Sequence, residues 1–171
     1  MHKKKGRRIK CNQEAMFLKQ IQTWKRYAVS ILIPLVVGAL AGFLTMDAME
    51  TFRRLEKPPL TPPAAVFPVV WTILYILMGI SAAMIAGKPD RKKALTVYGA
   101  QLLMNFVWTL LFFLAKQYFF AFVWLVVLWI LIVWMIVLFY KKSPTAALLQ
   151  VPYLLWVTFA GYLNVMIWLL N

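Results

Sequence analysis

The residues best suited to bind a ligand are amides and large aromatic side chains that recur at helical spacing in three apolar stretches. Positions three, four, seven or eight residues apart share one face of a helix. The three faces consist of Phe67, Trp71 and Tyr75; of Gln101, Asn105 and Trp108; and of Tyr153, Trp156, Ala160 and Asn164. Aromatic rings with a few amides suit a flat, mostly apolar ligand that carries some polar groups. We therefore predict that these side chains form one ligand-binding site.

A purely structural role for the amides is an equally direct interpretation. Amide side chains are costly in hydrocarbon unless they face the interior of a helix bundle or a cavity. Gln101, Asn105 and Asn164 therefore mark the inward faces of their helices. They could do no more there than hydrogen-bond between neighbouring helices, and the spacing alone favours neither interpretation.

The side chains that most enzymes and metal sites use are missing from the apolar part of the chain. His2 is the only histidine and Cys11 the only cysteine, and both precede the first apolar stretch. We therefore expect no metal site and no required cofactor. The apolar stretches also contain no Asp or Glu, which proton-coupled pumps use within the membrane. This inventory disfavours a conventional enzyme and an ion-coupled transporter.

The composition excludes a soluble domain. Of the 171 residues, 63% are hydrophobic and 14% are charged, whereas an ordinary soluble domain is about 45–50% apolar and about 25% charged. Intrinsic disorder is excluded by the same numbers, and a single cysteine cannot form an internal disulfide. A small polytopic membrane protein remains.

Five stretches are long enough to cross a bilayer. A hydrocarbon core of about 30 Å needs roughly 20 apolar residues as a helix. The qualifying stretches are 28–46, 64–87, 94–115, 118–140 and 146–170, and none contains Asp, Glu, Lys or Arg. We predict an all-α membrane protein in which residues 28–171 form a five-transmembrane-helix bundle and residues 1–27 a basic tail.

Local signals refine the helix ends. Thr61 is predicted to cap the second helix, with Pro62 and Pro63 where a missing N–H costs little. The prolines predicted to kink helices and widen the space between them are Pro34, Pro68 and Pro152.

The basic residues are distributed unevenly over the predicted loops. Segments 1–27, 88–93 and 141–142 hold 15 of the 19 Lys and Arg residues, and five crossings place all three segments on one side. The positive-inside rule then puts the N-terminus in the cytoplasm and the C-terminus outside. The formal net charge of +14 is therefore mainly an orientation signal, and we expect no nucleic-acid partner. The basic tail could also contact anionic membrane lipid.

The start of the chain allows more than one interpretation. The basic segment, the apolar run 29–37 and the Ala-Leu-Ala at 39–41 resemble a cleaved signal peptide, although the long basic region favours a retained span. Met16 could also be an alternative start, because core-like sequence resumes near Phe17.

The long loop 47–63 is predicted to lie on the outer side and to cap the site as a lid. Its cations Arg53, Arg54 and Lys57 could meet carboxylates of a ligand at the mouth of the site. The other residues assigned to this lid are Pro58, Leu60 and Pro62.

Five of the eight tryptophans need no functional explanation. Trp24 and Trp168 lie at opposite ends of the crossing region and are typical of interface belts. Trp124, Trp129 and Trp134 are five residues apart, about 140° each, so they share no single face and are predicted to contact lipid or neighbouring helices.

Four segments together resemble the TspO/MBR family of tryptophan-rich sensory proteins, which includes the mitochondrial translocator protein, or peripheral benzodiazepine receptor. They are LEKPPLTPP at 55–63, VFPVVWTILY at 66–75, QLLMNFVW at 101–108 and VPYLLWVTFAGYLN at 151–164. The resemblance covers roughly residues 30–171. The chain departs from the family pattern at Leu60, where an aromatic residue is frequent, and at Phe52, where a tyrosine is common.

The resemblance implies a five-helix bundle, often dimeric, that binds porphyrins such as protoporphyrin IX and benzodiazepine-type ligands under the first loop. Trp71 and Trp156 match the family's ligand-contacting tryptophans, with Asn105 and Trp108 alongside. Some bacterial members are proposed to promote light- and oxygen-dependent porphyrin breakdown, which makes the same two tryptophans candidate catalytic residues.

Three functions follow as hypotheses for a protein of the bacterial cell membrane. The first is a tetrapyrrole-binding sensor or regulator in porphyrin or stress handling. The second is a light-dependent porphyrin-degrading enzyme, and the third is a transporter of porphyrins or other amphiphiles.

Overall fold

The computed structural model describes residues 2–48, 52 and 54–171, and its regular elements are all helical. The elements are α1 (His2–Leu44), α3 (Val66–Ala86), α4 (Lys92–Thr109), the π-helical turn η1 (Leu110–Leu114), α5 (Tyr118–Tyr140), α6 (Pro144–Leu148) and α7 (Val151–Leu170). Among the described residues, five segments are long and apolar enough to cross a membrane: Met16–Leu44, Val66–Ala86, Lys92–Leu114, Tyr118–Tyr140 and Pro144–Leu170. The predicted all-α architecture with five spans is confirmed.

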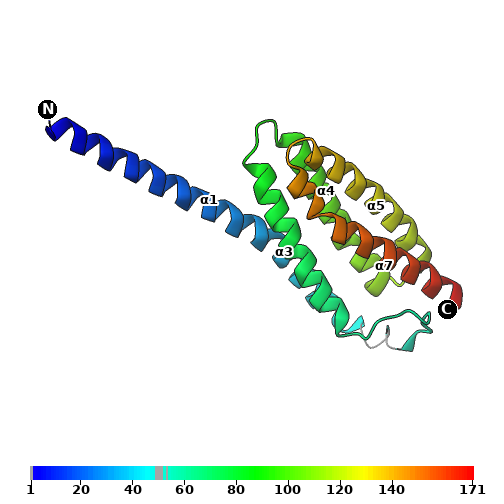
Figure 1. Cartoon of the computed structure of the whole chain (residues 1–171). Helices are drawn as coiled ribbons and strands as arrows, with labels where there is room; N and C mark the ends of the chain where they lie inside the picture. The colour runs from blue at the N-terminus through cyan, green and yellow to red at the C-terminus, as the bar shows by residue number, and fades with distance from the viewer. Residues whose placement is uncertain (1, 49–51, 53) are drawn as a thin grey trace.

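The predicted helix ends differ from the observed ends where a helix continues beyond its apolar stretch. The span predicted at 118–140 coincides with α5, but the first span is only part of α1, which starts at His2 instead of residue 28. Lys, Arg, Gln and Glu are good helix formers in water, so the basic segment continues the helix that the apolar segment begins. Figure 1 shows α1 extending well beyond the other helices.

Pro152 interrupts the last span. Proline lacks an N–H and its ring clashes with the carbonyl four residues earlier, which here belongs to Leu148. The helix therefore ends there as α6 and restarts as α7, with Pro152 in the first turn. Pro68 lies in the first turn of α3 and Pro34 inside the continuous α1, so of the three predicted kinks only the one at Pro152 coincides with a break between helices.

The predicted cap at Thr61 is wrong. The residue that precedes α3 is Ala65, which makes no side-chain capping bond. Thr61 Oγ1 instead donates to the backbone oxygen of Pro58 at 2.8 Å. The two prolines after Thr61 cannot donate backbone hydrogen bonds, and residues 61–63 have no regular secondary structure before the turn at 64–65.

Small residues bring α1 and α3 together. A Cβ atom at Gly79 would overlap the backbone of Ile31, and one at Gly38 would overlap the ring of Tyr75. Such close backbone approach is what glycine permits in membrane helices. On the other side of the bundle α5 packs against both α4 and α7.

The two ends of the bundle differ in their loops. At one end Lys142 Nζ, after α5, donates to the backbone oxygen of Pro89, after α3, at 3.1 Å. At the other end the loop before α3 meets the end of α7, where Glu56 N donates to Asn171 Oδ1 at 3.1 Å. We call these the basic end and the lid end, and their assignment to the two sides of the membrane stays a prediction.

Candidate functional site

Three side-chain hydrogen bonds join the helices that carry the predicted site residues. Asn105 Nδ2 donates to Tyr75 Oη at 3.1 Å, which links α4 to α3. Tyr153 Oη donates to Gln101 Oε1 at 2.9 Å, and Trp108 Nε1 donates to Asn164 Oδ1 at 3.1 Å, and both of these bonds link α4 to α7. The helical spacing therefore identified faces that converge in space.

Aromatic rings fill the space beside these hydrogen bonds. The rings of Trp71 and Tyr75 stack at 5.4 Å between centroids, and Tyr153 meets Trp71 edge-on at 6.2 Å. Phe67 meets Trp156 edge-on at 5.9 Å. We call these five rings the aromatic cluster. Edge-on and offset contacts of this kind stabilise aromatic pairs by about 0.5–1.5 kcal/mol beyond area burial.

The amides are interhelical pairing groups, as the structural interpretation predicted, and two of them keep unused capacity. Gln101, Asn105 and Asn164 are at most 1% exposed. Gln101 Nε2 and Asn105 Oδ1 have no hydrogen-bond partner among the described residues. Both amide atoms of Asn164 have a partner, because its Oδ1 accepts from Trp108 and its Nδ2 donates to the backbone oxygen of Tyr118 at 2.8 Å. Ala160 is buried in the same core.

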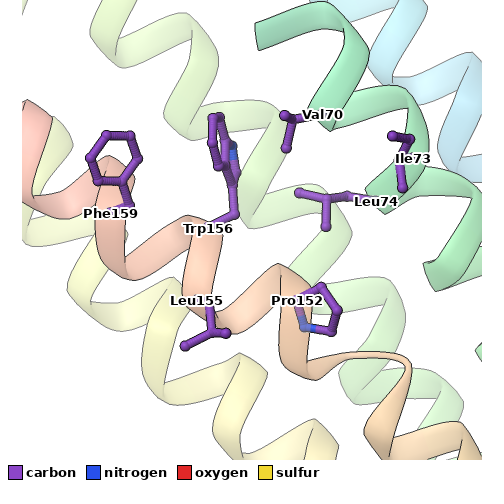
Figure 2. A pocket seen from close by; sticks show the side chains of 7 residues that line it. All are labelled: Val70, Ile73, Leu74, Pro152, Leu155, Trp156 and Phe159. Atoms are coloured by element: carbon purple, nitrogen blue, oxygen red, sulfur yellow. The ribbon is translucent and has the colours of Figure 1, made fainter. Parts of the chain in front are cut away.

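An apolar groove opens between α3 and α7 beside the aromatic cluster. Its volume is about 480 Å³, and it is lined by Val70, Ile73, Leu74, Pro152, Leu155, Trp156 and Phe159. Figure 2 shows Trp156 between Phe159 on its own helix and Val70 on α3. Trp156 thus belongs to both the aromatic cluster and the groove, and none of the other predicted site residues lines the groove.

Sequence reasoning missed most of the groove. Val70, Ile73, Leu155 and Phe159 are ordinary apolar residues, whose types and spacing resemble those of any lipid-facing surface. One available signal was Pro152, because a break between α6 and α7 changes the path of α7 beside α3.

Phe52 of the lid contacts the aromatic cluster at the lid end. This side chain is buried, and its ring centroid lies 6.4 Å from that of Phe67 and 5.5 Å from that of Phe113. Lys57 Nζ donates to the backbone oxygen of Leu55 at 3.2 Å and lies 5.2 Å from the centroid of the Phe52 ring. Phe52 therefore joins the lid to the aromatic cluster by an apolar contact.

The other predicted lid residues differ in exposure. Pro58 is buried and Pro62 is half-buried, whereas Arg54 is exposed and Leu60 is 67% exposed. Arg53 lies outside the described residues. The described part of the chain holds no group of three or more His, Cys, Asp and Glu side chains that could bind a metal ion.

Comparison with known proteins matches this arrangement to a family. The family model described as the TspO/MBR family matches residues 30–169, which span all five predicted crossings. The chain belongs to the TspO/MBR family. The resemblance inferred from the four sequence motifs is therefore confirmed.

Relatives of this TspO/MBR chain occur in bacteria and mammals. It is 40% identical over 158 residues to tryptophan-rich protein TspO of Chlorobaculum tepidum, and this match covers 90% of this chain and 98% of the relative. It is 35% identical to protein CrtK of Rhodobacter capsulatus, over 85% of this chain and 92% of the relative. It is 32% identical to the translocator protein of Bos taurus, over 80% of this chain and 85% of the relative. This TspO/MBR member is a multi-pass membrane protein.

Proposed function

We propose that this TspO/MBR protein binds a tetrapyrrole of the protoporphyrin IX type within a bacterial cell membrane and acts as a sensor or regulator in porphyrin or stress handling. The observation that carries the proposal is that Trp156 belongs to both the aromatic cluster and the groove. It touches Phe67 in the aromatic cluster and also lines the groove between α3 and α7. A flat ligand in the groove would therefore meet the cluster through one indole ring.

The groove has the size and chemistry for such a ligand. Its volume of about 480 Å³ falls within the range of about 300–1,000 Å³ that small-molecule sites occupy. Its lining side chains are apolar or aromatic, which suits a macrocycle that partitions into the bilayer. Benzodiazepine-type ligands share this flat, apolar chemistry.

The lid supplies charge for the polar part of the ligand. Arg54 is exposed and Lys57 is half-buried in the loop that covers the cluster. Guanidinium and ammonium groups bind carboxylates through charge-assisted hydrogen bonds, and porphyrins of this type carry carboxylates.

The direct test is a titration of the purified protein with protoporphyrin IX in the dark, followed by porphyrin absorbance. Saturable binding that weakens in Trp156→Phe and persists in Trp134→Phe supports the proposal, since Trp134 lies outside the cluster and the groove. Equal affinity of both variants would reject this site.

Light-dependent porphyrin breakdown is a second candidate, favoured by the surroundings of Trp71. Its ring stacks on that of Tyr75 and meets that of Tyr153 edge-on, and these three side chains are all oxidisable. Under illumination in oxygen, turnover faster than porphyrin bleaching in free solution would support this activity. The same rate in a Trp71→Phe, Trp156→Phe double variant would count against it.

We also propose that the protein forms a homodimer through α1. Leu32, Val36 and Phe43 on this helix are exposed, and a Cβ atom at Gly42 would meet nothing within 4 Å. A Gly42→Leu variant should therefore fold normally but dimerise less in nanodiscs, by mass photometry, whereas Gly99→Leu on α4 should not change dimerisation. An unchanged dimer fraction in Gly42→Leu would exclude this interface.

A further inference from the structure

A second group of polar side chains lies inside the bundle, toward the basic end from the aromatic cluster. Tyr98 is 8% exposed, and Gln101 and Gln150 are 0% exposed. Within the described chain, four of their polar atoms have no hydrogen-bond partner: Tyr98 Oη, Gln101 Nε2, Gln150 Nε2 and Gln150 Oε1. Gln150 is the extreme case, because both ends of a fully buried amide are unpaired.

The hydrogen bond between Tyr153 and Gln101 places these three side chains near one another. It joins α4 to α7, and both helices run from the basic end toward the lid end (Figure 1). Tyr98 precedes Gln101 by three residues, and Gln150 precedes Tyr153 by three residues. Three residues are nearly one helical turn, about 4.5 Å along the axis. Tyr98 therefore lies on the Gln101 face of α4, one step nearer the basic end, and Gln150 is the residue directly before α7, one step before Tyr153.

The groups around this site are already paired or apolar. Ser81 Oγ donates to the backbone oxygen of Ala146 at 2.7 Å. The backbone N–H of Gln150 donates to Ala147 O at 3.0 Å, so only its side chain is unsatisfied. The ring of Phe139 stacks against Tyr98 at 6.4 Å. Paired groups and the apolar ring of Phe139 thus offer no partner to the four unused atoms of Tyr98, Gln101 and Gln150.

The chemistry of the unused atoms identifies a ligand class. Gln101 offers N–H donors, Gln150 offers donors and an acceptor, and Tyr98 offers both. All three side chains are neutral, so they do not favour an ion. Buried polar groups in native proteins are nearly always paired, and ordered internal water typically supplies about three hydrogen bonds where protein groups do not. We propose that Tyr98, Gln101 and Gln150 form an internal binding site for ordered water.

This site is connected to the aromatic cluster through one residue. Gln101 uses its Oε1 for Tyr153, whose ring contacts Trp71. Water held by Gln101 Nε2 would fix the amide in the orientation that accepts the Tyr153 hydroxyl. The proposal is independent of which ligand the cluster binds.

Solid-state NMR on the full chain in lipid bilayers tests the site directly. Magnetisation transferred from water should reach the side-chain amides of Gln101 and Gln150 several-fold faster than that of Asn164. Asn164 is the internal control, because Trp108 and Tyr118 occupy both ends of its buried amide. A build-up at the two glutamines no faster than at Asn164 would overturn the proposal.

Thermal unfolding tests the water site independently, through the direction in which the Tm changes. If water is bound, Gln150→Leu displaces it and leaves Tyr98 and Gln101 unpaired, so the Tm should fall by about 2–4 °C. A Tyr98→Phe, Gln150→Leu double variant should lose less than the sum of the single losses, because fewer polar groups remain unpaired. If Gln150 is instead a dry, unpaired amide, Gln150→Leu removes its cost and raises the Tm, which would refute the site.

Discussion

Trp108 and Asn164 are joined by a buried hydrogen bond of 3.1 Å from the indole Nε1 to the amide Oδ1, although they are 56 residues apart in the chain. Because Asn164 also donates to the backbone of Tyr118, the pair connects α4, α7 and the start of α5. Three helices thus meet at one amide near the lid end.

We expect the Trp108→Phe variant to be less stable by about 1–3 kcal/mol, because it leaves a buried amide oxygen without its donor. A double-mutant cycle with Asn164→Leu should give a coupling energy of about 0.5–3 kcal/mol, measured by unfolding in detergent. Trp129→Phe is the matched control, since its Nε1 bond of 2.9 Å to Thr158 Oγ1 is exposed. Equal losses at Trp108 and Trp129 would contradict the special role of the buried bond.

Porphyrin affinity should depend on the ring of Trp156. We expect Trp156→Phe to weaken binding of protoporphyrin IX about 2- to 10-fold, the equivalent of one lost aromatic contact of about 0.5–1.5 kcal/mol. Phe159→Leu should weaken it as well, since Phe159 lines the groove but lies outside the predicted site. A loss in Trp156→Phe without a loss in Phe159→Leu would place the ligand in the aromatic cluster alone.

The contact between α1 and α3 should not tolerate a larger residue at Gly79. A Cβ atom there would overlap the Ile31 backbone, and overpacking costs typically about 1–3 kcal/mol. We expect Gly79→Ala to lower the unfolding temperature measured by differential scanning fluorimetry. Gly99→Ala should leave it unchanged or raise it slightly, because that helical position is open and alanine is the better helix former. A tolerant Gly79 would mean that α1 is not seated on α3 as described.

The lid should loosen when its bond to the end of α7 is removed. Asn171 accepts from Glu56 N and donates to Glu56 O, each at 3.1 Å. In Asn171→Ala we expect hydrogen exchange at the Glu56 amide to accelerate about tenfold, the equivalent of roughly 1.4 kcal/mol. The Thr61 amide, bonded to Pro58 O at 3.0 Å, should exchange as before. Unchanged exchange at Glu56 would show that the bond to Asn171 does not hold the lid.

Sequence patterns predicted the spans well because hydropathy and helical spacing are local properties. The inward faces were found from Gln101, Asn105 and Asn164, since hydrocarbon excludes amides. The hydrogen-bond partners of these amides were not predicted, because a partner depends on how each helix is rotated and shifted against its neighbour. The groove was missed for a related reason, since Leu155 and Phe159 have no composition that separates a groove from a lipid-facing surface.

The length of α1 determines which surroundings its basic segment experiences. The helix begins at His2, whereas the apolar stretch within it begins only after Arg26, the last charged residue of the basic segment. At about 1.5 Å per residue, the first turns stand roughly 35 Å beyond that stretch. That distance exceeds two Debye lengths of about 8 Å at physiological ionic strength. While α1 is straight, the charges at its N-terminal end are screened by salt from the charges of the bilayer surface. Contact between this N-terminal end and anionic lipid therefore requires α1 to bend, whereas Lys25 and Arg26 lie directly beside the apolar stretch.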